Sequence, residues 1–547
     1  MKTFRIIITI ILSAGLVSCD KVLEEKAYSR LTEDLAFTTG ENAQAAVNGM
    51  YYSMHVLYLY NCYFNDICVD SGFRPGDIFE QLNQANIQAV DSNDYMWTLN
   101  YFTISRANVI IETVPKMDAE LFKAVHTQEQ MVAEARFMRA FSYMNLTDLY
   151  YQVPLTLTND LDVRDIRNFN TIESIEEAME NDLILCKSGL PKRYPRSEAS
   201  RPTYGAACGL LCRLYMRQAG RLRQKGQDAT EIWNKALAEA NEVLALEGSE
   251  YELLANVKGP FDASTYDTLN NKELIFAVRS SDSLSDCSWY LGLEFTPWEY
   301  DYGWGSFWVP LEVAWAFDPA DKRLTDLIVR DYNEYQTNPK RVHLTPPSVE
   351  KVGSMLSTLD DSYELTYCKE NIAVCTKKYE YQKPGSYNYN TANNYPLMRL
   401  ADFILCKAEI LNELNGPTQE AIDLINRIRR RAFGNNGHNL TLASFPDKAS
   451  LREALCDERL FELNMEGTRR VDLIRMGLWK DRMDKYIASQ KEKAEWKARN
   501  EGKDIDFYKN EYIGYPTDLT EDDVRRYFPI PAFELELNPD LANARNQ

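Results

Sequence analysis

Residues 450–479 read SLREALCDERLFELNMEGTRRVDLIRMGLW. Ser450 and Glu453 stand at the spacing of a capping box, in which each side chain bonds to the backbone N–H of the other residue. An apolar stripe at helical spacing follows and consists of Leu451, Leu455, Phe461 and Met465. We therefore expect a helix that begins at Ser450 and buries this stripe.

Three glutamates lie four residues apart on a neighbouring face of this helix: Glu458, Glu462 and Glu466. Stacked carboxylates repel one another, so they need cations nearby. Gly467 can adopt the left-handed conformation that ends a helix, and the chain beyond it carries Arg469, Arg470 and Arg475. We expect these arginines to pair with the glutamates and to join two helices in an ion-pair network.

The same glutamates allow an alternative interpretation, because glycosidases place two carboxylates on either side of the bond that they cleave. A general acid, however, needs surroundings that raise its pKa, whereas carboxylates that face arginines usually ionise and pair. The chain contains no Gly-rich phosphate loop, no G-x-S-x-G motif and no cysteine–histidine arrangement typical of a nucleophile. We favour a structural role for the stretch and assign no catalytic residue.

Residues 458–477 contain the motif E-R-x-x-E-L-x-x-E-G-x-R-x-x-D-L-x-R-x-G. This motif closely resembles the C-terminal signature of the SusD/RagB family of outer-membrane lipoproteins. Residues 133–155 (AEARFMRAFSYMNLTDLYYQVPL), residues 395–433 and the FPIP sequence at 528–531 resemble the same family, in the family's order. The resemblance implies a mostly α fold, in which a tetratricopeptide-like array of helical hairpins carries the ligand site on long irregular loops. It also implies that residues 450–479 are architectural.

Amphipathic runs along the chain agree with a helical array. They lie at residues 42–54, 95–111, 129–154, 174–186, 204–219, 232–246, 397–411 and 417–428. In the second run one face is formed by Trp97, Tyr101, Ile104 and Asn108. Because the chain is longer than single cores usually grow, we expect an N-terminal helical region at 42–250 and a C-terminal region at 251–547, which holds the aromatic loop and a helical hairpin.

The first 18 residues have the features of a signal peptide, with Lys2 and Arg5 before a short apolar run. The run ends in Leu-Val-Ser-Cys at 16–19, which resembles a bacterial lipobox, so we expect Cys19 to be acylated and residues 19–41 to form an extended leader. An ordinary secretory signal is the alternative. Asp20 allows an alternative location, because in some Gram-negative bacteria an aspartate at this position retains a lipoprotein at the inner membrane.

The composition narrows the range of ligands. Lys and Arg together number 61 against 81 Asp and Glu, so we expect no nucleic-acid partner. The four histidines stand at no zinc spacing. Cys208 and Cys212 lie four residues apart in an apolar helical pattern, where buried thiols are expected. We therefore expect no metal and no cofactor.

A different composition marks residues 289–308, where nine of twenty residues are aromatic and glycine and proline predict a loop. Rings on a loop can offer flat apolar faces to the C–H faces of a sugar. The candidate ligand residues of this loop are Trp289, Tyr290, Trp298, Tyr300, Tyr302, Trp304 and Trp308. The alternative is that these rings form a satellite core over the helices.

The family resemblance implies further ligand residues in the N-terminal half of the chain. The matching region contains Asp66, Asp70, Arg74, Trp97 and Asn100. Trp97 has a second interpretation as a core residue of its helix.

Together these features predict a lipid-anchored protein on the outer face of the outer membrane that binds oligosaccharide or polysaccharide. The resemblance implies that it passes this ligand to a SusC-like TonB-dependent transporter. Two alternatives stay open at this point: a peptide-binding member of the same family, and a surface glycoside hydrolase.

Overall fold

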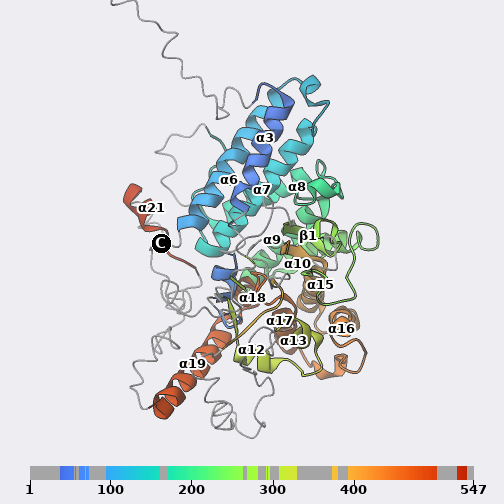
Figure 1. The fold of residues 1–547 in the computed structure, drawn as a ribbon, viewed down its shortest axis with the longest axis vertical. Helices are drawn as coiled ribbons and strands as arrows, with labels where there is room; N and C mark the ends of the chain where they lie inside the picture. Colours follow the sequence, from blue (N-terminus) through green and yellow to red (C-terminus); the bar gives the residue numbers. More distant parts are fainter. Residues whose placement is uncertain are drawn as a thin grey trace, which may run out of the picture.

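The computed structural model describes residues 37–54, 56, 61–67, 69–72, 94–159, 170–262, 268–280, 291, 294–295, 307–328, 373–379, 392–501 and 527–538. In the N-terminal half, long helices run side by side (Figure 1). They are α3 (Gly40–Met50), α6 (Asp94–Thr113), α7 (Gln128–Tyr150), α8 (Ile172–Lys187), α9 (Tyr204–Gln224) and α10 (Thr230–Leu244). Each of α6 to α9 packs against the next helix in the chain, as in an array of helical hairpins.

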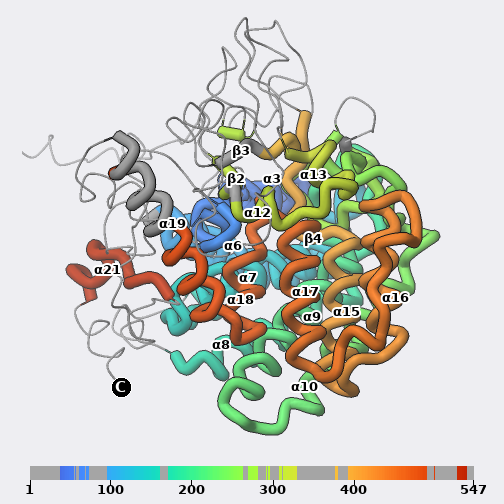
Figure 2. The backbone as a smooth tube through the Cα atoms, turned by 90° about the horizontal axis from the view of Figure 1, so that it is seen from below, coloured from blue at the N-terminus to red at the C-terminus, as the bar shows by residue number. Residues whose placement is uncertain are grey.

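The C-terminal half continues this array. Its helices are α12 (Leu311–Ala316), α13 (Lys322–Leu327), α15 (Leu400–Asn415), α16 (Gln419–Phe433), α17 (Lys448–Leu463), α18 (Arg469–Met476), α19 (Trp479–Glu501) and α21 (Ala532–Leu537). Helices α15, α16 and α17 lie side by side, as Figure 2 shows. Helix α10 packs against α15 and so joins the two halves. The expected mostly α, tetratricopeptide-like fold is confirmed.

Short elements complete the described part of the chain. Two antiparallel ribbons pair β1 (Leu274–Val278) with β4 (Tyr395–Arg399) and β2 (Trp308–Pro310) with β3 (Ala373–Cys375). One turn of π-helix, η3, spans Tyr63–Ile67. The 3-10 turns are η2 (Tyr51–Ser53), η6 (Val114–Lys116), η7 (Ala119–Phe122), η9 (Arg196–Glu198), η10 (Thr268–Asn270) and η12 (Leu442–Ser444). The ring of Phe276 in β1 packs edge-on against Phe137 and Phe141 of α7, which ties this ribbon to the helical core.

Threonine side chains fix the starts of several helices. In each case the hydroxyl oxygen accepts a hydrogen bond from the backbone N–H three residues later, which satisfies a donor that the first turn leaves unpaired. The capping residues are Thr39 for α3, Thr127 for α7, Thr171 for α8, Thr203 for α9 and Thr418 for α16. The helix starts are thus encoded locally, which explains why the predicted amphipathic runs lie close to the observed helices.

Helix α17 begins at Lys448, two residues before the predicted start at Ser450. Asp447 is the N-cap, and its Oδ1 accepts from the Ser450 backbone N–H at 2.8 Å, while Ser450 Oγ accepts from the Asp447 N–H at 3.3 Å. The predicted capping box with Glu453 was therefore wrong, because the Asp447 carboxylate takes the capping role. The helix ends at Leu463, and Gly467 lies beyond it with the expected positive φ of 72°.

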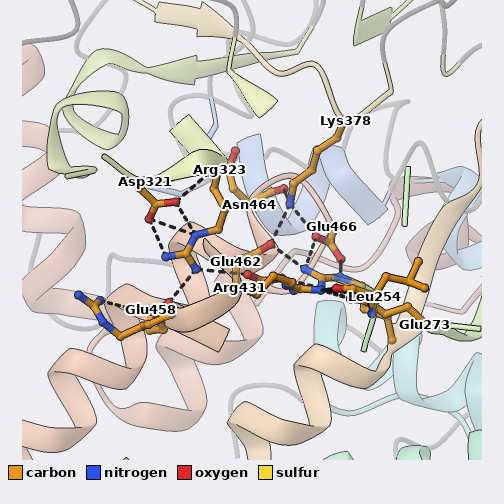
Figure 3. Close-up of polar contacts among 12 residues, drawn as sticks. Leu254, Glu273, Asp321, Arg323, Lys378, Arg431, Glu458, Glu462, Asn464 and Glu466 are labelled. Carbon is orange, nitrogen blue, oxygen red and sulfur yellow. Dashed lines mark hydrogen bonds and ion pairs between the residues drawn. The ribbon is translucent and has the colours of Figure 1, made fainter. Parts of the chain in front are cut away.

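The three glutamates lie at the centre of a buried ion-pair network (Figure 3). Glu458 and Glu462 belong to α17, whereas Glu466, which was predicted on the same helix, lies in the turn beyond its end. Glu458 pairs with Arg323 at 2.7 Å and with Arg429 at 2.8 Å. Glu462 bonds with Arg323, Arg399 and Arg431. Glu466 pairs with Lys378 at 2.6 Å and with Arg399 at 2.7 Å. The predicted network exists, but α13, β4, α16 and the segment after β3 supply its cations.

The arginines that were expected to fill this role bind elsewhere, so that part of the prediction was wrong. Arg469 pairs with Asp70 at 2.6 Å, and Arg475 pairs with Glu409 at 2.7 Å. Arg470 donates to the backbone carbonyl of Asp148 at 2.7 Å. The reason is geometric, because α18 packs against α9 and η3, whereas the carboxylates of α17 point toward α13, α16 and β4.

Burial by itself would raise the pKa of Glu462, but the charges of Arg431, Arg399 and Arg323 outweigh it and hold the pKa well below the ordinary value. The carboxylate is therefore ionised. Removing it would leave three guanidinium groups without a full set of partners in a site that water does not reach.

We expect Glu462→Ala to lower the free energy of unfolding by roughly 3–5 kcal/mol, the usual cost of breaking a buried ion pair from one side. Denaturant titration measures it. Glu453→Ala is the matched control, because it removes an exposed glutamate of the same helix and should leave stability almost unchanged. Equal stability of the two variants would contradict a structural role for the network.

Candidate functional site

The predicted ligand residues fall into two groups. Seven lie outside the described residues: Arg74, Trp289, Tyr290, Trp298, Tyr300, Tyr302 and Trp304. The predicted lipidation site, Cys19, also lies outside them. The other five lie in described segments: Asp66, Asp70, Trp97, Asn100 and Trp308.

Asp66 and Asp70 attach the N-terminal segment to the turn between α17 and α18. Asp66 Oδ2 accepts from the Gly467 backbone N–H at 2.6 Å, and its Oδ1 accepts from Ser71 Oγ at 3.3 Å. Asp70 forms a two-point ion pair with Arg469, at 2.8 Å to Nε and 2.6 Å to Nη2. These bonds connect residues about four hundred positions apart in the chain. Both carboxylates thus hold two distant segments together.

Trp97, Asn100 and Trp308 lie inside the protein. Trp97 is 3% exposed, and its ring packs 5.0 Å from Tyr101 and 5.1 Å from Tyr150. Asn100 is fully buried and accepts from Asn145 at 3.2 Å. Trp308 is 4% exposed on β2. In this conformation the three side chains have almost no surface to offer a ligand, and a ligand-binding role for the five described residues stays a prediction.

The opposite side of α6 presents aromatic rings to solvent. Tyr95 is 55% exposed and Phe102 is 36% exposed, and Tyr52 of η2, which packs beside α6, is 71% exposed. The Tyr52 and Phe102 rings meet edge-on with centroids 6.3 Å apart. The guanidinium of Arg106 lies 3.7 Å from the centre of the Phe102 ring. We call this set, Tyr52, Tyr95, Phe102 and Arg106, the α6 aromatic surface.

Sequence reasoning missed this surface, although the helical period contains the signal. At about 100° per residue, Tyr95 and Phe102 share one face of α6, whereas Trp97 is turned about 200° away from Tyr95. The run Trp97, Tyr101, Ile104 and Asn108 was predicted as one face, and its members are buried or half-buried. The outer face is therefore the one that can meet a flat ligand, with the N–H donors of Arg106 beside it.

The described part of the chain offers little for metal or nucleophilic chemistry. Within it, no group of three His, Cys, Asp or Glu side chains is placed to hold a metal ion. Cys208 and Cys212 are buried free thiols, as predicted, and burial raises the pKa of Cys208 to about 12. A thiol with so high a pKa is a poor nucleophile at neutral pH.

The glutamates of α17 do not have the properties of a glycosidase pair. The pKa of Glu462 is lowered, as its three arginine partners dictate, whereas a general acid of this class needs a raised pKa. Glu458 and Glu462 are 2% and 4% exposed, so a polysaccharide has no access to them.

The fold places this chain among the mostly α proteins built from a tetratricopeptide-like array of helical hairpins. Comparison with known proteins then identifies the family. Residues 305–546 match the family model described as "SusD family", and residues 21–216 match one described as "Starch-binding associating with outer membrane". Of the helices that the structure describes, none combines the length and apolar character needed to cross a membrane. The chain belongs to the SusD/RagB-like family.

Relatives and solved structures agree over almost the whole chain. SusD-like protein P25 of Formosa agariphila is 25% identical over 517 residues, which are 88% of this chain and 91% of that protein. A SusD homologue from Bacteroides thetaiotaomicron has a TM-score of 0.68 at 21% identity and covers 93% of this chain and 97% of its own. Surface glycan-binding protein A from Bacteroides uniformis has a TM-score of 0.67 at 20% identity, with 92% and 98% covered.

Burial of Asp66, which attaches the N-terminal segment, predicts an unusual pH dependence of protein stability. Loss of hydration on burial raises the pKa of Asp66 to about 7, although the bonds from Gly467 and Ser71 act in the opposite direction. The folded state then binds a proton more tightly than the unfolded state, whose aspartate has a pKa of about 4. The stability that Asp66 contributes is therefore present at low pH and is lost as pH rises through about 7.

Asp66→Asn should remove this titration. We expect the free energy of unfolding of the wild type, relative to the variant, to fall by on the order of 2–3 kcal/mol between pH 5 and pH 8. Urea denaturation across this range measures it. Asp228→Asn is the control, because hydrogen bonds from Thr230 lower the pKa of Asp228, so that this carboxyl is ionised throughout the range. A stability difference for Asp66→Asn that does not change with pH would refute the assignment.

Proposed function

We propose that this chain is a cell-surface lipoprotein that binds oligosaccharide or polysaccharide and delivers it to a TonB-dependent outer-membrane transporter. The observation that carries the proposal is the match of both halves of the chain to one family, together with a fold shared over more than 90% of the chain with a surface glycan-binding protein. The description of the N-terminal match, which refers to starch binding and to the outer membrane, supports both the ligand class and the location.

The proposed glycan site combines the aromatic loop at residues 289–308 with the α6 aromatic surface. Exposed rings recover the free energy of burial only when a ligand covers them, and the C–H face of a sugar fits a flat ring. Arg106 beside Phe102 adds donors for hydroxyl groups. We propose that the chain binds its glycan without chemical conversion, so that a purified sample should not cleave polysaccharide.

Two double variants test which rings bind the glycan. We expect Trp298→Ala/Trp304→Ala and Tyr52→Ala/Tyr95→Ala each to weaken binding about tenfold, because each stacked ring contributes on the order of 1 kcal/mol. Calorimetry with the glycan selected on an array measures affinity, and thermal melting checks the fold.

The control for these variants is Ile184→Ala/Leu185→Ala, which removes two exposed apolar side chains of α8 and should leave binding unchanged. A double variant that melts far below the wild type would show that its rings belong to the core. If both aromatic pairs bind as the wild type does, the proposed site is wrong.

The lipid anchor has a direct test at Cys19. We propose that Cys19 becomes the acylated N-terminal residue, since the thioether to the lipid can form only at its sulfur. Cys19→Ser should then abolish acylation and release the protein from the membrane fraction. Mass spectrometry of the N-terminal peptide measures the acylation. An acylated peptide in the variant, or an unlipidated wild type, would contradict the proposed anchor.

A further inference from the structure

A cavity of about 300 Å³ lies where the C-terminal ends of α7 and α9 meet α18 and the start of α8. The residues that matter for its chemistry are Asp148, Tyr151, Arg217, Arg221, Lys225 and Tyr527. None of them belongs to the predicted aromatic loop or to the α6 aromatic surface. This volume is at the lower end of the range for small-molecule sites and suits a single sugar unit.

The backbone at Tyr151 holds an aromatic ring at the edge of the cavity. Helix α7 ends at Tyr150, and Tyr151 has φ 68° and ψ −72°. The Gln152 N–H donates to the Tyr150 carbonyl at 2.9 Å, which makes Tyr151 the centre of a γ-turn of the rare, strained type. The Tyr151 ring packs against Tyr527 with centroids 4.7 Å apart. In the described chain neither hydroxyl group has a hydrogen-bond partner.

Cations outnumber carboxylates among the residues that line the cavity. Among the described residues, four cations line it, Arg217, Arg221, Lys225 and Arg475, against one carboxylate, Asp148. Carboxylates outside the lining hold the arginines in place. Glu176 pairs with Arg221 and Arg217, and Glu173 lies 3.9 Å from Arg221. Glu409 and Asp472 pair with Arg475. Arg217 bonds to Asp148 at 2.8 Å.

Lys225 differs from these arginines. It is the C-cap residue of α9, its side chain is exposed, and its ammonium group has no ion-pair or hydrogen-bond partner in the described segments. Cations often lie at helix ends to satisfy carbonyl groups, but the carbonyls of α18 here already have donors. Gln224 Nε2 lies 2.9 Å from the Ile474 carbonyl, and Arg223 Nη2 lies 3.0 Å from the Arg475 carbonyl. The ammonium of Lys225 is thus left for another acceptor.

We propose that this cavity, which we call the tyrosine–arginine cavity, binds an acidic sugar unit through its carboxylate or sulfate group. The inference rests on the proposed glycan-binding function and names a ligand class for a second site. Arginine and lysine bind both anions, while the Tyr151–Tyr527 pair offers a ring edge and two hydroxyl groups to the sugar.

The charge of the whole chain affects how an acidic ligand would bind. The formal net charge is −20, so an acidic polysaccharide meets general repulsion at the surface. The ammonium group of Lys225, which has no partner among the described residues, is then a specific place where an acidic unit gains attraction. Binding there should weaken with added salt, because the charges are partly exposed to solvent.

Ligand-detected NMR with the full mature chain tests the inference, and the probes are glucuronate, glucose 6-sulfate and glucose. We expect at least one acidic probe to bind and glucose to bind at least tenfold more weakly. Lys225→Glu should weaken binding of the acidic probe at least tenfold, and Tyr527→Phe should weaken it several-fold without loss of fold. Lys258→Glu is the matched control, because it changes the net charge equally at an exposed lysine away from the cavity, and it should bind within twofold of the wild type.

Each outcome separates this inference from the proposed function. Binding of only one acidic probe identifies carboxylate or sulfate as the recognised group. If neither acidic probe binds, if glucose binds equally well, or if Lys225→Glu and Lys258→Glu behave alike, the acidic-sugar site is refuted, while glycan binding at the aromatic rings is untouched. Conversely, loss of glycan binding in the aromatic variants with intact binding of the acidic probe would leave this site in place.

Discussion

Burial of the α17 carboxylates is the constraint on which the rest of the structure depends. Within the described chain, the network of Figure 3 contains five carboxylates and five cations: Glu273, Asp321, Glu458, Glu462 and Glu466 with Arg323, Lys378, Arg399, Arg429 and Arg431. Charges removed from water are costly unless every one of them is paired. Since the partners come from six separate segments, the network is satisfied only when all six are in place. It therefore selects one arrangement of the C-terminal half more than it adds stability.

The turn after α17 extends the same constraint to the N-terminal half. Asp66 and Asp70 bind this turn at Gly467 and Arg469, and Asn464 Nδ2 donates to the Ser71 carbonyl at 3.1 Å. The segment fixed in this way leads toward α6, whose outer face carries the aromatic surface. The signature stretch thus positions both halves of the chain.

The parts of this fold that could be predicted are the ones that local periodicity and capping decide. Helices α6 to α10 follow from apolar spacing, helped by threonine caps at α7, α8 and α9. An ion-pair network followed from three glutamates in one stripe. The partners of those glutamates did not follow, because Arg323, Lys378 and Arg399 lie far away in sequence and only the packed chain brings them close. For the site, the family resemblance pointed to α6 and favoured Trp97, whose ring is buried. Its burial depends on α7, since Tyr150 covers the ring, and a pattern within α6 alone cannot show which face a partner helix covers.

The signature stretch also forms one wall of the tyrosine–arginine cavity, which links architecture to recognition. Gly220 of α9 has no side chain, and a Cβ there would lie 2.6 Å from the Arg475 carbonyl oxygen, so that α9 and α18 can approach closely only with glycine at this position. Arg470 of α18 holds the last turn of α7 through the Asp148 carbonyl. Both contacts fix the distance between the cationic wall on α9 and the strained turn at Tyr151. The size of the cavity is therefore set by the same residues that hold the two halves of the chain together, and a change in that packing would alter which ligand fits.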